Sequence, residues 1–131
     1  MQILFTISTP EELPCIVDAV HDHWFDIEKI VFDQATHTLH IPFESEVRKS
    51  WFSFRRNKDT PLKYVLTIRD VQRYQIHDTQ KIGRYDFNEL LYNADKGLIT
   101  VTTGIPLDFT IYVSGINMSI CLRSEPAHKN C

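Results

Sequence analysis

The hydrophobic pattern of the chain changes its period at one place, and this change most constrains the fold. Between residues 9 and 21, apolar side chains recur at helical spacing, which gives one apolar stripe. The stripe consists of Leu13, Ile16, Val17 and Val20. From Ile27 onward, apolar side chains alternate with a period of two, as in half-buried strands. The chain is therefore expected to be α+β and mostly β, with one N-terminal helix near residues 10–21 on an antiparallel sheet or β-sandwich of about eight to ten strands.

The helix has a recognisable start. Thr9 can cap it, Pro10 suits its first position, and Glu12 completes a capping box. Pro14 removes one hydrogen bond of the early helix, so the start is expected to shift by a residue or two.

The strands are expected wherever the alternation holds. In the first of them, Ile3, Phe5 and Ile7 share one face. Pro42 has no amide donor, which predicts a place at a sheet edge or near a strand end. The expected strands cover residues 2–7, 27–32, 38–43, 50–55, 62–69, 71–77, 85–92, 98–102, 107–113 and 118–122.

Two hairpin segments, residues 32–41 and 92–101, resemble each other without gaps. Each has an aromatic residue, then Asp33 or Asn93, then a short polar turn and an alternating strand. The Asp or Asn side chain can bond the turn backbone, and His37 or Gly97 is expected in the left-handed conformation. We interpret this as the same turn used twice.

Length and cysteine usage indicate one reduced intracellular domain. The 131 residues suit a single domain, expected over residues 1–122 with a flexible tail at 123–131. Cys15 and Cys121 fall within apolar patterns and are expected to be buried, while Cys131 is terminal. With no CxxC pair, no signal peptide and no apolar run of about 18 residues, we expect a cytoplasmic protein without a membrane span or a cofactor.

The best candidate for a site lies where the period changes. His21, Asp22, His23 and Asp26 are close in sequence, and imidazole and carboxylate groups are ligands of zinc and related metals. His21 and His23 are therefore candidate metal ligands, although the familiar helical pair of histidines four residues apart is absent. The alternative is a polar helix end, with His21 near the negative helix terminus and Trp24 and Phe25 in the core.

Charge is distributed unevenly along the chain. Residues 1–47 carry a net charge of −8, and residues 48–73 carry +6. The basic segment interleaves cations such as Arg55 and Arg56 with aromatic rings, a combination that can bind single-stranded nucleic acid. Because the whole chain is negative, at −3, we expect such binding less than packing of acidic against basic segments.

The chain resembles small uncharacterised bacterial β-rich domain families, some of which are grouped with immunity proteins of toxin systems. The resemblance covers roughly residues 20–110 and is carried by three stretches. These are residues 21–27 with the following hairpin, residues 66–71 and residues 74–78. It implies a binding or inhibitory role and supplies no catalytic residues.

Three functions remain open from the sequence. The first is non-catalytic binding of another protein, as an immunity-like or accessory factor, with a homodimer through an uncovered edge or face as a further possibility. The second is a metal-dependent or acid–base enzyme centred on His21, Asp22, His23 and Asp26. The third is nucleic-acid binding through residues 48–73.

Overall fold

A computed structural model describes residues 2–44 and 63–123 of the chain. Two short 3-10 turns, η1 and η2, and one α-helix accompany the strands in this part. The elements are β1 (Gln2–Ile7), η1 (Pro10–Glu12), α1 (Leu13–Val20), β2 (Trp24–Asp26), η2 (Ile27–Lys29), β3 (Val31–Asp33), β4 (Thr38–Glu44), β5 (Lys63–Ile68), β6 (Val71–His77), β7 (Arg84–Asn93), β8 (Leu98–Thr103), β9 (Asp108–Val113) and β10 (Met118–Leu122). The strand expected at residues 50–55 lies outside the described residues.

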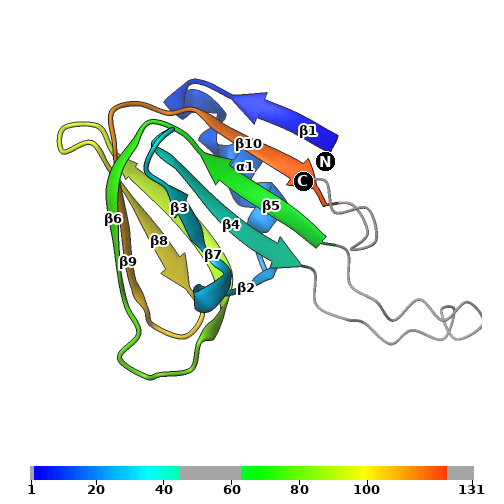
Figure 1. Cartoon of the computed structure of the whole chain (residues 1–131), viewed down its shortest axis with the longest axis vertical. Coiled ribbons are helices and arrows are strands. Elements are labelled where there is room, and N and C mark those ends of the chain that lie inside the picture. The colour runs from blue at the N-terminus through cyan, green and yellow to red at the C-terminus, as the bar shows by residue number, and fades with distance from the viewer. Residues whose placement is uncertain (1, 45–62, 124–131) are drawn as a thin grey trace, which may run out of the picture.

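The ten strands of the described residues form one antiparallel sheet in the order β1-β10-β5-β4-β2-β7-β8-β9-β6, with β3 paired to β4 beside β2. The α+β, mostly β prediction is therefore confirmed. In Figure 1 the helix α1 lies behind β10 and β5, and it contacts both β10 and β7. Short β2 joins the two halves of the sheet, because it pairs with β4 on one side and β7 on the other.

The helix begins as the sequence predicts, with one adjustment. The Glu12 carboxylate accepts hydrogen bonds from the Ser8 and Thr9 backbone N–H groups at 3.0 and 3.1 Å. Pro14 is accommodated because the first turn is 3-10 and the α-helix begins at Leu13, where a missing N–H near the start costs little.

The core joins the helix to both halves of the sheet. Leu13, Ile16 and Val20 of α1 are buried in this core. The buried rings of Phe25, Phe87 and Phe109 pack together in the same core. The Phe25 ring centroid lies 4.5 Å from that of Phe87 and 6.0 Å from that of Phe109. Since β2 supplies Phe25, this three-residue strand is held by packing as well as by pairing.

The two hairpins use the same turn, as the sequence predicts. His37 and Gly97 both have positive φ, at 54° and 63°. The side chain of Asp33 accepts a hydrogen bond from Ala35 N, and that of Asn93 accepts one from Lys96 N.

One strand prediction is wrong. Residues 27–29 form the turn η2 instead of a strand, and the pairing role falls to β2 and β3 on either side. Pro42 lies near the end of β4, as the sequence predicts, and pairs with β5 on one side. On the other side of β4, its partner changes from β3 to β2 next to Pro42. The position where Pro42 lacks an N–H therefore falls in the gap between β3 and β2.

Two predictions of side-chain placement are also wrong. Ile3 is 57% exposed, because the β1–β10 register shifts between Ile3 and Phe5 and removes Ile3 from the face of Ile7. Cys15 is exposed, whereas Cys121 is buried as predicted. Cys15 directly precedes Ile16 of the buried helical stripe and so turns away from the core.

Candidate functional site

His21 and His23 make local contacts at the end of α1. His21 Nδ1 lies 3.0 Å from the backbone oxygen of Asn88, and its Nε2 lies 3.5 Å from exposed Asp22. His23 Nδ1 lies 3.1 Å from the His21 backbone oxygen. The His23 ring also packs edge-on against Phe43, with centroids 5.5 Å apart. These contacts fit the interpretation of this segment as a polar helix end.

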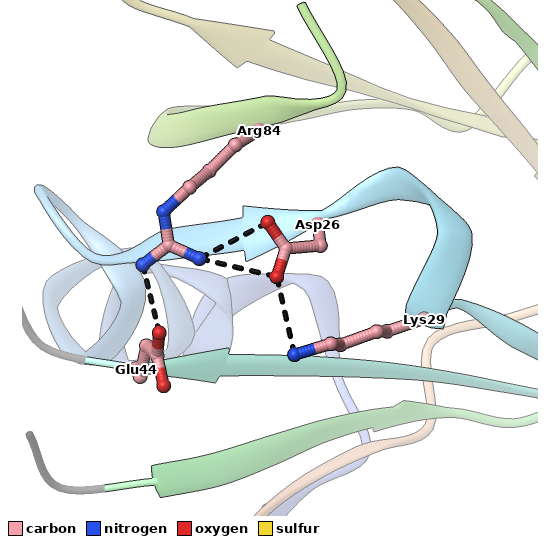
Figure 2. Close-up of polar contacts among 4 residues, drawn as sticks. All are labelled: Asp26, Lys29, Glu44 and Arg84. Carbon is pink, nitrogen blue, oxygen red and sulfur yellow. Dashed lines mark hydrogen bonds and ion pairs between the residues drawn. The ribbon is translucent and has the colours of Figure 1, made fainter.

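Asp26 belongs to a different group of side chains (Figure 2). Its carboxylate accepts two hydrogen bonds from Arg84 Nη1, at 3.0 and 3.1 Å, and lies 3.3 Å from Lys29 Nζ. Arg84 Nη2 donates to Glu44 at 2.7 Å. Arg84, Asp26 and Glu44 come from β7, β2 and β4, so the guanidinium ties together the three strands at the junction of the sheet.

This ion-pair cluster is electrically balanced and closely packed. Burial lowers the pKa of Arg84, but the hydrogen bonds to Glu44 and Asp26 outweigh it and leave the pKa raised. The space lined by the cluster measures about 10 Å³, close to the minimum that holds one water. The cluster therefore links β2, β4 and β7 as a structural clamp.

The predicted candidates are thus only partly brought together. His21, Asp22 and His23 remain neighbours, while Asp26 turns toward Arg84. Within residues 2–44 and 63–123, no group of three or more His, Cys, Asp or Glu side chains is arranged to hold a metal ion.

The basic segment is described only from residue 63 onward, so Arg55 and Arg56 lie outside the described residues. Arg69 donates a 2.8 Å hydrogen bond to Ser119 Oγ. The Arg73 guanidinium carbon lies 3.9 Å from the centre of the Tyr112 ring. Both cations thus have partners within the fold.

A partly buried polar pair closes the loop before β7. The Tyr85 hydroxyl donates to Asp78, whose carboxylate also accepts from the backbone N–H groups of Ile82 and Gly83. The Tyr85 hydrogen bond, with the backbone donors, lowers the pKa of Asp78. Burial and the Asp78 partner raise the pKa of Tyr85.

An apolar concavity with room for a ligand lies between α1 and β7. This α1–β7 groove has a volume of about 480 Å³ and opens to solvent. Leu91, at its wall, is 51% exposed although its neighbour Leu90 is buried. The groove is lined by Pro10, Leu13, Pro14, Val17, Asp18, Glu89, Leu90, Leu91 and Tyr92.

Sequence reasoning missed this groove because its walls are some seventy residues apart. One signal was present in the sequence. Leu90, Leu91 and Tyr92 are consecutive apolar residues, whereas a strand with one solvated face alternates. A second apolar surface could have been inferred from that run.

Comparisons of the chain with protein-family models, with curated proteins and with solved structures find no match. Among the described residues, no helix is long and apolar enough to cross a membrane.

Proposed function

We propose that the protein binds another protein through the α1–β7 groove, as an immunity-like or accessory factor. The observation that carries this proposal is half-exposed Leu91 beside an open apolar groove of about 480 Å³. Apolar surface of this kind, bordered by polar side chains, is typical of an interaction site.

The groove is suited to binding because its walls are already in place. Leu13 anchors one wall through its buried side chain, and Leu90 anchors the other. The β7–β8 ladder holds the backbone of the second wall over residues 87–93. A partner would therefore bind with little ordering of this surface, which lowers the entropic cost of association.

A partner side chain covering Leu91 would supply a modest hydrophobic gain. Complete burial of a leucine is worth about 1.5–3 kcal/mol, so covering its exposed half contributes roughly 1 kcal/mol. The rest of the affinity must come from the other groove residues and from polar contacts at the rim.

Photo-crosslinking in cells of the source organism tests this function. A benzophenone amino acid replaces Leu91 in one variant and Ile105, 38% exposed and absent from the groove lining, in the control. We expect irradiation to give a discrete heavier adduct from position 91 only. Equal adducts from both positions, or none from position 91, would refute the proposal.

A further inference from the structure

One edge of β7 is covered along only part of its length. β2 pairs with β7 over Arg84–Asp86. The chain before β2 then contacts Phe87 through backbone bonds and the backbone oxygen of Asn88 through His21 Nδ1, at 3.0 Å. Phe87 N donates to His23 O, and Phe87 O accepts from Asp22 N, both at 2.9 Å. Past this point, no strand of the described chain pairs with residues 89–93 on the side away from β8.

The register shows which backbone groups face this open edge. Glu89 faces β8, since its N–H donates to Thr102 Oγ1 at 2.9 Å. From there the β7–β8 register runs without a shift to Asn93. Because hydrogen-bonding direction alternates along an antiparallel strand, the N–H and C=O groups of Leu90 and Tyr92 point away from β8.

The open edge and the α1–β7 groove coincide. Leu90, Leu91 and Tyr92 of the edge also line the groove, whose opposite wall is α1. A second hollow continues along β7 to the hairpin turn and is lined by Leu91, Tyr92, Asn93, Ala94, Asp95 and Thr100. An extended segment lying along the edge would thus meet backbone groups and apolar side chains together, the arrangement used in strand addition.

The charges of the groove select the partner. Asp18 and Glu89 line the groove, and Asp95 lines its continuation. No Lys, Arg or His is among the described residues that line either hollow. A second copy of the chain would place carboxylates against carboxylates, whereas a basic segment would neutralise them.

We infer that an extended segment of the partner, with Lys or Arg alternating with apolar residues, adds as a strand to residues 89–93 of β7. This inference rests on the proposed function and specifies how the partner is held. Its backbone bonds to Leu90 and Tyr92, its apolar side chains enter the groove, and its cations meet Asp18 and Glu89.

Selection from a phage library of random ten-residue peptides tests the chemistry of the segment. The full chain serves as bait, and the Leu91→Arg variant serves as the matched control. We expect enrichment, on the unaltered chain only, of peptides in which basic and apolar residues alternate. Enrichment of acidic or proline-rich peptides, equal enrichment on the control, or no enrichment would overturn the inference.

Backbone methylation of an enriched peptide tests strand addition itself. Two forms are made, with N-methyl groups on the odd or on the even residues, so that only one form loses the N–H groups facing β7. We expect one form to bind at least tenfold more weakly and the other to bind within about threefold of the parent. Amide exchange of Leu90 and Tyr92 should slow in the parent complex. Equal effects of the two forms, or unchanged exchange, would overturn strand addition.

The two proposals can fail separately. A discrete crosslink at Leu91 without strand-like peptides would leave protein binding standing and remove the β7 edge as its mode. Peptides that bind the β7 edge, without any crosslink at Leu91 in cells, would refute the proposal that a protein partner occupies the groove in cells.

Discussion

Replacing Arg84 should destabilise the fold through the junction of β2, β4 and β7. Arg84→Met keeps most of the aliphatic stem and removes three hydrogen bonds to the carboxylates of Asp26 and Glu44. Charge-assisted hydrogen bonds are worth about 1.5–3 kcal/mol each when buried, and exposed ion pairs about 0–1 kcal/mol. The Arg84 side chain is 40% exposed and its partners 19% and 23%, which places the cluster between these limits. We expect a loss of about 2 kcal/mol in the free energy of unfolding, or roughly 6–10 °C in Tm.

Urea denaturation of the unaltered chain, four single variants and the double variants of a mutant cycle measures this loss. Arg84→Lys keeps the charge and loses the planar fork, so it should recover less than half of the stability. Asp26→Asn and Glu44→Gln each remove one carboxylate, and combining either with Arg84→Met gives a double-mutant cycle. In 1 M salt the difference should shrink, because the partly exposed pairs are screened. A loss below about 0.5 kcal/mol for Arg84→Met would show that the clamp does not hold the junction.

Three further predictions follow from single contacts. In Tyr85→Phe, the pKa of Asp78 should rise toward its ordinary value of 3.8, measured by carboxyl NMR titration. The lowered pKa of Asp78 stabilises the fold at pH values above 3.8. The unaltered chain should therefore lose stability faster than Tyr85→Phe as the pH falls below 3.8. Equal decreases of the urea midpoint in the two proteins on acidification would contradict this. Gly97→Ala should lower the free energy of unfolding by about 1–2 kcal/mol, measured by thermal melts, because φ of Gly97 is +63° and the added Cβ would lie 2.8 Å from a β9 carbonyl oxygen. The control Gly115→Ala should be near neutral, since Gly115 has open space around it and no positive φ. Leu91→Lys should leave Tm within about 2 °C, because the side chain is half-exposed, and a larger drop would mark Leu91 as part of the core.

Much of the fold could be read from local patterns. The helix was readable because Leu13, Ile16 and Val20 recur at its spacing and because Thr9 and Glu12 mark its start. The hairpin turns were readable because His37 and Gly97 occupy equivalent positions after a side chain that bonds the turn. In each case the interaction lies within a few residues, where sequence spacing and spatial distance are nearly the same.

The site could not be read in this way. Asp26 was grouped with His21 and His23 because they are close in sequence, yet it pairs with Arg84, fifty-eight residues away. The groove unites Leu13 with Leu91 only because α1 packs against β7. Neither the Asp26–Arg84 ion pair nor the groove leaves a periodic signal in the sequence, because each depends on which elements become neighbours in the fold.

The amino-acid pattern predicted the class of the fold, the placement of most strands, the helix start and the shared turn. These follow from side-chain period, capping and backbone conformation, which act over short stretches of chain. Only the tertiary structure decided that β2 joins the two halves of the sheet, that Arg84 clamps that junction, and that the edge of β7 stays open beside α1. These features depend on strand order and on the packing of distant apolar faces, and many orders satisfy the same alternation of residues.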